Sequence, residues 1–291
     1  MELTALRQLL AIAEAGHMTR AARSLGVTQP TLSAMLRRVE DELGVELFHR
    51  TARGVEPTEA GIAFLEHAGE SVRAADRGVE AVRALAGLEA GSIRVGGGAT
   101  AMGALLPTVI GRVRREHPGV RFTAREAGSA AVASAVRAGE LDLGVITLPA
   151  DGGVGTDLIA VATVEDELRL IVPAEHRLFG RERFGWADLA GEPVVAFEAG
   201  SAVRTVIDEA ARTGGVELDV VVELRSIQSI ERMVGVGVGV GFVSRLVSPD
   251  MGLACADGAL VRRLAVVRRS DRMPSPAGAL FERVLLGVLS A

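Results

Sequence analysis

The chain contains no lysine, asparagine or tyrosine, and it has a single cysteine, Cys255. One thiol cannot form an internal disulfide, so the sequence excludes a redox switch made of two cysteines in one chain. The five histidines are scattered, and no group of cysteine and histidine residues has the spacing of a zinc site. We therefore expect neither a metal nor another cofactor. The exclusive use of arginine as the long basic residue is typical of GC-rich coding rather than of a function.

Long apolar runs are also missing. The longest, residues 233–243, is rich in glycine and far shorter than the roughly 20 residues that span a bilayer. The first residues, MELTALRQLLAIAEAG, carry Glu2, Arg7 and Glu14 within an apolar pattern, and they lack a basic start and a small-residue cleavage site. We expect a cytoplasmic protein with neither a secretory signal nor a membrane span.

A positive net charge is absent as well. The net charge of −5 gives no general attraction to nucleic acid, so any DNA binding depends on a local arginine patch. Residues 1–60 hold seven arginines against eight acidic residues, a net charge of −1. One such module is expected to bind DNA weakly, so useful affinity requires paired modules in at least a dimer.

Helical periodicity begins at the N-terminus. The first helix is expected to end at Gly16, and Thr19 is expected to cap a second short helix that Gly26 stops. Thr28 is expected to cap a third helix, which places Gln29 and Pro30 in its first turn, where proline is tolerated. The apolar residues on one face of the first helix are Leu3, Leu6, Leu9, Leu10 and Ala13.

Two short helices joined by a tight turn form a helix-turn-helix. The helical spacing directs Leu32, Met35 and Leu36 inward, and it directs outward the residues Gln29, Thr31, Ser33 and Arg37. In the segment 45–61, Arg50 and Arg53 flank a turn at Gly54, and Val55 is expected to pair back as a two-stranded wing.

A long helix is expected from Thr58 onward. Its apolar residues follow a seam close to a heptad repeat, Leu65, Ala68, Val72, Ala75, Val79, Val82 and Leu85. A lone helix of this length has no core for its stripe, so the seam predicts a dimer. The alternative is that the helix docks on its own domain.

After Gly91 the pattern changes to alternating strands and helices, which predicts parallel strands with crossover helices. The expected strands are 92–98, 120–128, 141–148, 167–173, 193–200, 216–224, 238–244 and 260–269. The expected helices are 99–119, 129–140, 201–215, 226–237 and 277–289, the last of which returns to the first half of this region.

The N-terminal residues resemble the LysR-type transcriptional regulators. The resemblance lies in the ordered set AARSLGVTQPTLSAMLRRVEDELGVELFHR followed by VEPTEAG, and it continues through GSIRVG, LLPTVIGRVRREHPGV, AGELDLGV and GVGVGFVSR. It covers essentially the whole chain. The departures, such as Leu9 where the family often has phenylalanine and Thr28 where serine is commoner, leave the interpretation unchanged.

The resemblance implies an α/β protein with a winged helix-turn-helix, a linker-helix dimer and a two-lobed periplasmic-binding-protein-like (type II) effector domain. The implied bounds are 1–60 for the DNA-binding domain, 58–87 for the linker helix and 92–291 for the effector domain. Lobe I would comprise 92–162 and 268–291, and lobe II 163–267. The family also suggests a dimer of dimers, a homotetramer, with RNA polymerase as a further partner.

The expected DNA contacts lie on the third helix and the wing. Gln29 at a helix N-terminus can bond an adenine edge bidentately, while Thr31 and Ser33 can reach bases or phosphates, unless they are ordinary solvated surface. Arg37, Arg50 and Arg53 suit phosphates or the minor groove. The complete expected set is Thr19, Thr28, Gln29, Pro30, Thr31, Ser33, Arg37, Arg50 and Arg53.

A small-molecule effector is expected between the lobes, where loops follow the carboxyl ends of strands. The expected pocket is Thr100, Ser129, Thr147, Gly200, Ser201 and Gln228. For the helix-start residues Thr100, Ser129 and Ser201, simple helix capping is the alternative. The pocket hypothesis predicts that Thr100→Val and Ser201→Ala weaken effector binding without abolishing DNA binding. Glu198 either favours a cationic group on the ligand or pairs with Arg204.

Two other classes of protein fit less well. A solute-binding protein would suit the last two hundred residues or so, but not the helix-turn-helix or the absence of a signal peptide. A cytosolic enzyme would need a nucleophile elbow, a metal cluster or a cofactor fingerprint, and none is present in a matching context. The GGGAT run before the helix at Thr100 lacks the lysine of a P-loop.

Overall fold

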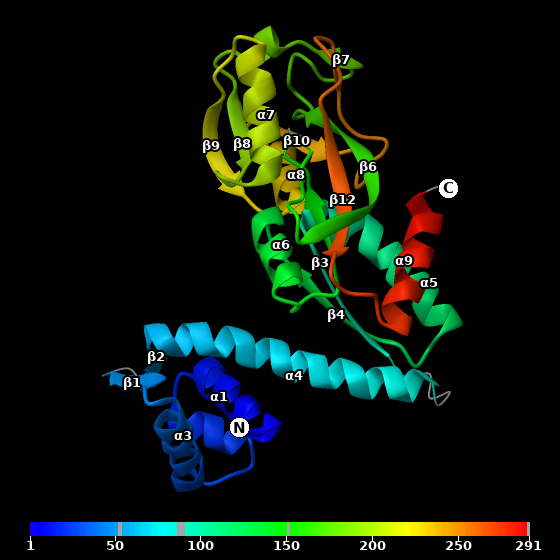
Figure 1. Cartoon of the computed structure of the whole chain (residues 1–291). Coiled ribbons are helices and arrows are strands. Elements are labelled where there is room, and N and C mark those ends of the chain that lie inside the picture. The colour runs from blue at the N-terminus through cyan, green and yellow to red at the C-terminus, as the bar shows by residue number, and fades with distance from the viewer. Residues whose placement is uncertain (52–53, 86–90, 150–151, 290–291) are drawn as a thin grey trace. The chain divides into compact units, whose positions relative to one another are not determined.

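The computed structural model of the chain describes residues 1–51, 54–85, 91–149 and 152–289 (Figure 1). The chain forms two compact units, residues 1–86 and 87–291. Within the residues described, no helix is both long and apolar enough to cross a membrane. Each unit is described separately below.

The first unit is a winged helix-turn-helix followed by one long helix. Its elements are α1 (Leu3–Ala15), α2 (Met18–Ser24), α3 (Gln29–Leu43), β1 (Phe48–Thr51), β2 (Gly54–Pro57) and α4 (Glu59–Leu85). Gly16 ends α1 in a left-handed conformation (φ 61°), as predicted. The prediction that Thr19 caps α2 is wrong, because His17 occupies the cap position and Thr19 lies inside the helix. A single extended residue separates Gly16 from α2, which leaves no room for a later cap.

Helix α3 begins as the sequence predicts. Thr28 is its N-cap, the Thr28 hydroxyl accepts a hydrogen bond from the Thr31 N–H at 3.3 Å, and Pro30 lies in the first turn. The prediction that Ser33 points outward is wrong, since Ser33 is buried and accepts a hydrogen bond from Gln29 Nε2 at 2.9 Å. Its small side chain lies at the border of the apolar stripe, where packing closes over it.

The predicted wing is present. Strands β1 and β2 pair antiparallel, with Phe48 opposite Pro57 and Thr51 opposite Gly54. The wing is tied to the end of α1 by the Val55 N–H, which donates to the Gly16 carbonyl at 2.8 Å. A Cβ atom at Gly54 would lie 2.2 Å from that same carbonyl oxygen, so this approach requires glycine.

Helix α4 uses its apolar seam in two ways. Its first half packs along α1, with Ala68 and Val72 buried. Just beyond this half, Asp76 forms an ion pair with Arg7 of α1. The docking alternative is therefore correct for this half. Farther along, the residues Val79 and Val82 are 51% and 66% exposed in the single chain. The side chain of Leu85, also assigned to the seam, lies outside the residues described.

The second unit is built on a mixed eight-stranded sheet in the order β4-β3-β5-β12-β6-β10-β8-β9. The strands are β3 (Ser92–Gly97), β4 (Arg121–Glu126), β5 (Leu143–Thr147), β6 (Leu158–Ile171), β7 (Arg183–Phe184), β8 (Pro193–Phe197), β9 (Asp219–Leu224), β10 (Val240–Ser244), β11 (Ala254–Cys255) and β12 (Val261–Arg269). The helices are the π-helical turn η1 (Ala101–Leu105), α5 (Leu106–Glu116), α6 (Ser129–Arg137), the 3-10 turn η2 (Trp186–Leu189), α7 (Ala202–Thr213), α8 (Ile227–Gly235) and α9 (Pro276–Leu289).

Two antiparallel strands, β6 and β12, run through the middle of this sheet (Figure 1). On one side lie the parallel strands β3, β4 and β5, and on the other the parallel strands β8, β9 and β10. Strand β6 pairs with β12 from Leu158 to Glu167 and with β10 from Leu168 to Ile171. The sequence predicted only the second part of β6, because the acidic residues 165–167 interrupt its apolar pattern.

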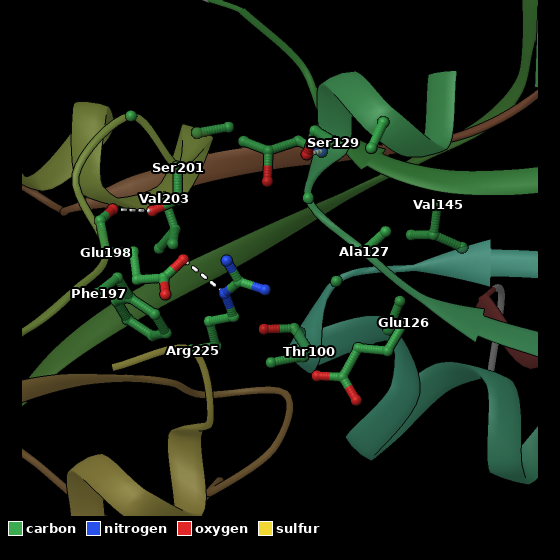
Figure 2. Close-up of a pocket in the computed structure, with 18 of the residues that line it drawn as sticks. Thr100, Glu126, Ala127, Ser129, Val145, Phe197, Glu198, Ser201, Val203 and Arg225 are labelled. Atoms are coloured by element: carbon green, nitrogen blue, oxygen red, sulfur yellow. Dashed lines mark hydrogen bonds and ion pairs between the residues drawn. The ribbon is translucent and has the colours of Figure 1, made fainter. Parts of the chain in front are cut away.

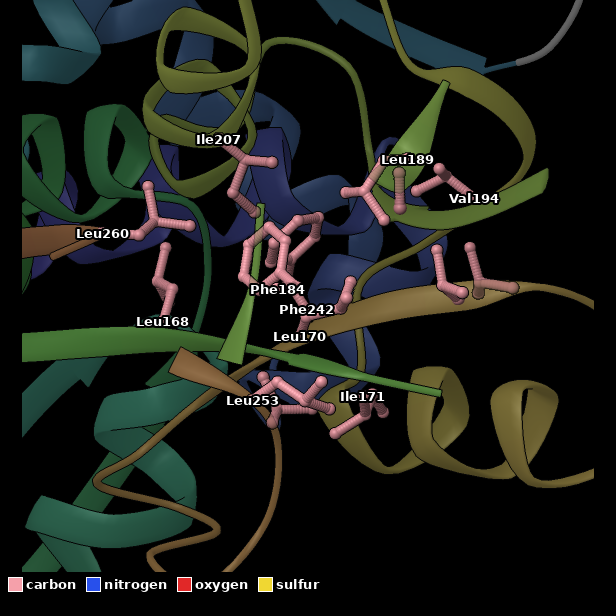
Figure 3. Close-up of a cluster of buried hydrophobic side chains, with 14 of the residues drawn as sticks. Leu168, Leu170, Ile171, Phe184, Leu189, Val194, Ile207, Phe242, Leu253 and Leu260 are labelled. Carbon is pink, nitrogen blue, oxygen red and sulfur yellow. The ribbon is translucent and has the colours of Figure 1, made fainter. Parts of the chain in front are cut away.

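The two lobes, which lie on either side of the central strands β6 and β12, have separate hydrophobic cores. The first lobe, around β3–β5, packs Ile93 and Val95 against Phe281 and Leu285 of α9, so the last helix returns to the first half as predicted. The second lobe, around β8–β10, is centred on aromatic rings, and Phe184 and Phe242 have ring centroids 6.0 Å apart (Figure 3). These cores hold the strand ends that surround the site.

Candidate functional site

A cavity of about 580 Å³ lies where the carboxyl ends of strands from both lobes meet. Figure 2 shows Thr100 and Ser129 on its first-lobe side and Glu198 and Ser201 on its second-lobe side. Five of the six predicted pocket residues line it, namely Thr100, Ser129, Thr147, Gly200 and Ser201. Gln228 is exposed on α8 and is not among the lining residues.

The first-lobe wall presents three hydroxyl groups whose oxygens already accept a hydrogen bond. Arg262 donates through Nη2 to Thr100 Oγ1 and through Nη1 to Thr147 Oγ1, the latter at 3.3 Å. The Thr147 N–H donates to Ser129 Oγ at 2.9 Å. Guanidinium and amide groups only donate, so each hydroxyl must act as the acceptor. Each hydroxyl therefore keeps its own hydrogen, and within the described part of the chain this hydrogen is not donated to any other residue.

The second-lobe wall differs, because its serine is fully used as a helix cap. Ser201 Oγ donates to the Glu198 carbonyl at 2.8 Å and accepts from the Arg204 N–H at 3.4 Å. The capping alternative is thus correct for Ser201. It is wrong for Thr100 and Ser129, neither of which makes a side-chain cap. The second wall offers the first-turn backbone of α7 beside the apolar side chains of Phe197 and Val203.

The buried Arg262 lines the cavity and is called its floor below; it forms an ion pair with Asp166, which is not among the lining residues. The Arg262 and Asp166 side chains are 6% and 0% exposed, and Arg262 Nε donates to Asp166 Oδ2 at 2.9 Å. Asp166 Oδ1 accepts from Ser244 Oγ at 2.7 Å and from the Leu246 N–H at 3.4 Å. Burial lowers the pKa of Arg262, and the attraction of Asp166 opposes this effect. The guanidinium stays charged because arginine does not deprotonate in proteins.

An exposed ion pair also lines the cavity, on its second-lobe side. Arg225 Nε lies 2.6 Å from Glu198 Oε2, and the Arg225 side chain is 83% exposed (Figure 2). The alternative pairing of Glu198 with Arg204 is wrong, since Arg204 binds Asp208 at 2.8 Å and Glu223 at 3.0 Å. The first lobe contributes another carboxylate, Glu126, at the end of β4.

Sequence reasoning missed several lining residues, above all Arg262. A signal for it was present: in LVRRLAVV, the residue Arg262 alternates with Leu260 and Leu264 and so shares their inward face. An arginine on an apolar face needs a buried acceptor, but its partner Asp166 is distant in sequence. Arg225, Glu126 and Phe197 carry no comparable signal, because each stands at the end of a strand or just after it, where the apolar pattern stops.

The rest of the side-chain chemistry is sparse. Across the described part of the chain, no group of three or more His, Cys, Asp or Glu residues is placed to hold a metal ion. Cys255 is a buried free thiol, and burial raises its pKa, which disfavours the reactive thiolate.

The predicted DNA contacts are only partly exposed. Gln29 is half-buried through its bond to Ser33, Ser33 itself is buried, and Arg53 lies outside the residues described. The remaining members are exposed, namely Thr19, Thr28, Pro30, Thr31, Arg37 and Arg50. The Thr28 and Thr31 hydroxyls lie 2.8 Å apart at the start of α3. The start of α3 thus exposes the polar residues Thr28 and Thr31 together with Pro30.

Two known structures resemble the whole chain in fold. A full-length OxyR variant from Pseudomonas aeruginosa has a TM-score of 0.75 and 24% identity, over 98% of this chain and 94% of that one. Full-length CbnR complexed with its target DNA has a TM-score of 0.74 and 22% identity, over 99% of both chains. The CcmR regulatory domain from Synechocystis PCC6803, in complex with 2-PG, has a TM-score of 0.61 and 20% identity, over 68% of this chain and 97% of that one.

Sequence comparison identifies the family. Residues 3–62 match the bacterial regulatory helix-turn-helix protein model of the lysR family, and residues 86–290 match the LysR substrate binding domain. A probable RuBisCO transcriptional regulator of Synechocystis sp. is 32% identical over 98% of this chain and 85% of that protein. The regulator AlsR of Bacillus subtilis is 31% identical over 84% of this chain and 80% of that protein. These relatives are transcriptional regulators rather than enzymes, and the chain belongs to the LysR family of transcriptional regulators.

Proposed function

We propose that this regulator acts in the cytoplasm, binds promoter DNA as a dimer or a dimer of dimers, and responds to a small-molecule effector in the cavity between its lobes. The observation that carries the effector role is the first-lobe wall, where the Thr100, Ser129 and Thr147 hydroxyls keep free hydrogens at a cavity of about 580 Å³. Donors left without a partner favour a ligand that brings acceptors, such as a carboxylate or a phosphate.

Recognition of DNA is assigned to α3 and the wing. The polar first turn of α3 would enter the major groove, where the Gln29 amide exchanges its internal bond to Ser33 for an adenine edge. The Ser33 hydroxyl holds Gln29 before DNA binds and is assigned no contact of its own to the DNA. Arg37, Arg50 and Arg53 would contact phosphates. CbnR, which shares the fold, has been solved with its target DNA. RNA polymerase at the same promoter is a further proposed partner.

Self-association is assigned to the second half of α4. Val79 and Val82 are 51% and 66% exposed there, on the part of the seam that does not dock on α1. Burying such side chains in a partner helix recovers their hydrophobic free energy. A dimer or larger species is expected by light scattering at micromolar concentration. Finding a monomer would contradict this assignment.

The proposed domain bounds are those expected from the sequence. We place the DNA-binding domain at 1–60, the linker helix at 58–87 and the effector domain at 92–291. The hydrophobic cores support a crossing between the lobes near Asp166 on β6 and near Arg262 on β12, since Leu264 packs in the first lobe whereas Leu168 and Leu260 pack in the second. On β12 this crossing precedes the expected boundary at 267–268.

The first experiment is footprinting of the full-length protein on the DNA upstream of its own gene. We expect protection of a dyad-symmetric site. Gln29→Ala is expected to weaken it by roughly tenfold or more, the value of one bidentate base contact. Gln8→Ala on α1 is the matched control. A complete lack of protection at low salt would contradict the proposed function.

A further inference from the structure

The Arg262–Asp166 pair occupies the two strands that run between the lobes. Strands β12 and β6 place Arg262 and Asp166 directly opposite each other in their antiparallel register. The side chains are 6% and 0% exposed, so the pair is buried where these two strands pass from one lobe to the other. A shift of either side chain therefore acts on both central strands, because the ion pair connects them.

The pair also reaches into each lobe. Arg262 donates to Thr100 at the start of η1 and to Thr147 at the end of β5, both on the first-lobe wall of the cavity. Asp166 accepts from the Ser244 hydroxyl at the end of β10 in the second lobe. It also accepts from the N–H of Leu246, which follows β10 by two residues and whose side chain packs against the first-lobe core. One continuous set of hydrogen bonds thus connects the cavity wall to the opposite lobe.

Stability alone is a weak reason for such a pair. Buried ion pairs can often be replaced by apolar residues of similar volume without loss of stability, because desolvation offsets their attraction. An apolar pair cannot donate hydrogen bonds to the Thr100 and Thr147 hydroxyl oxygens, as Arg262 does. These bonds leave the hydrogens of both hydroxyls available to the cavity. An acceptor that takes those hydrogens polarises the hydroxyls, strengthens their bonds to Arg262 and thereby alters the hold of Arg262 on Asp166.

We propose that Arg262 is a positioning residue that couples the effector cavity to the end of strand β10 in the second lobe, through Asp166 to Ser244 and to the N–H of Leu246 just after it. This inference rests on the proposed effector function for its biological meaning. The physical coupling itself requires no effector, because removing a threonine hydroxyl perturbs Arg262 from the same side as a ligand would. The coupling is therefore measurable in the full-length protein alone.

The test is amide hydrogen exchange at Leu246, whose N–H donates to Asp166 at 3.4 Å. Thr100→Val and Thr147→Val keep the side-chain shape and remove one acceptor of Arg262 each. We expect each to change the Leu246 exchange rate by roughly fivefold, the equivalent of one hydrogen bond of average strength. Thr123→Val, the same change at an exposed site on β4 of the same lobe, is expected to leave the rate unchanged.

Arg262→Lys separates coupling from a merely structural role. Its ammonium can still pair with Asp166, but it lacks the planar fork that binds an acid and two hydroxyls at once. We expect Leu246 to keep its protection in this variant and to lose its response to Thr100→Val. If Arg262→Lys fails to fold, the double variant Arg262→Met, Asp166→Leu replaces it. Hydrogen exchange is then measured at the Ser248 N–H, which donates to the Ser244 carbonyl at 3.0 Å.

Two results would overturn the proposal. One is a Leu246 exchange rate in Thr100→Val and Thr147→Val equal to that in Thr123→Val. The other is an exchange rate that still responds to Thr100→Val when Arg262 is absent, measured at Leu246 in Arg262→Lys or at Ser248 in the double variant Arg262→Met, Asp166→Leu. Neither result depends on DNA or on an effector, so both are distinguishable from a failed footprint.

Discussion

The two walls of the cavity use similar residues in opposite ways. On the first-lobe wall, the hydroxyls of Thr100, Ser129 and Thr147 accept hydrogen bonds from inside the protein and keep their hydrogens for the cavity. On the second-lobe wall, Ser201 spends both its donor and its acceptor on the start of its own helix. A hydroxyl beside a helix start is therefore not a ligand group by position alone. Whether it can bind a ligand depends on the hydrogen bonds that it already makes within the protein.

The charged residues repeat this contrast. Arg262 on the first side is buried and donates to three acceptor groups. Arg225 on the second side is 83% exposed, and its one partner among the described residues is Glu198. A buried charge left without its partner is costly, while an exposed pair contributes little. Changes on the floor and the first wall are thus expected to have larger effects than changes on the second wall.

The largest effect is expected from breaking the buried pair. Arg262→Met or Asp166→Leu alone leaves one uncompensated charge inside the protein, and we expect the free energy of unfolding to fall by about 3–5 kcal/mol. Changing both together is expected to restore most of this loss. Urea and thermal unfolding of the four proteins give the comparison. Arg263→Met, an exposed neighbour on the same strand, is the control. Single variants as stable as wild type would refute this contrast between the walls.

Removing one free donor is expected to have the next largest effect. Thr100→Val should weaken binding of the compound that alters the footprint by roughly fivefold, because one hydrogen bond contributes about 1 kcal/mol. DNA binding without effector should be unchanged. Calorimetry and footprinting with the same preparation measure the two affinities. Equal effector affinity in Thr100→Val and wild type would mean that the first wall does not hold the ligand.

Ser201→Ala is expected to give the reverse result. The variant loses a helix cap, which costs about 1 kcal/mol of stability. Because the Ser201 hydroxyl has no free hydrogen bond to give, we expect its effector affinity to stay within roughly twofold of wild type. This outcome replaces the expectation from sequence that Thr100 and Ser201 act alike. Thermal unfolding and calorimetry on Ser201→Ala and Thr100→Val together decide between them.

Local patterns were sufficient for much of the fold and for the outline of the site. Caps and periodicity located α3 with Thr28 and Pro30 correctly, and strand ends brought five of six expected residues to one cavity. The misses arise where a distant partner decides. Ser33 is buried by packing, and Asp166 belongs to a part of β6 that its acidic neighbours concealed. The inward direction of Arg262 follows from its alternation with Leu260 and Leu264, but its partner Asp166 is far away in sequence, so no local pattern identifies the pair.

The smallest effect on stability is expected at the exposed pair. Arg225→Gln should change the free energy of unfolding by less than about 0.5 kcal/mol, since exposed ion pairs are screened by water and salt. The same change frees Glu198 at the cavity and so makes the second wall more negative. An effector with an acidic group near this wall should then bind more weakly, and more so at low salt. If calorimetry at two salt concentrations shows no change, the effector is held by the first wall and the floor, and the pair only borders the entrance.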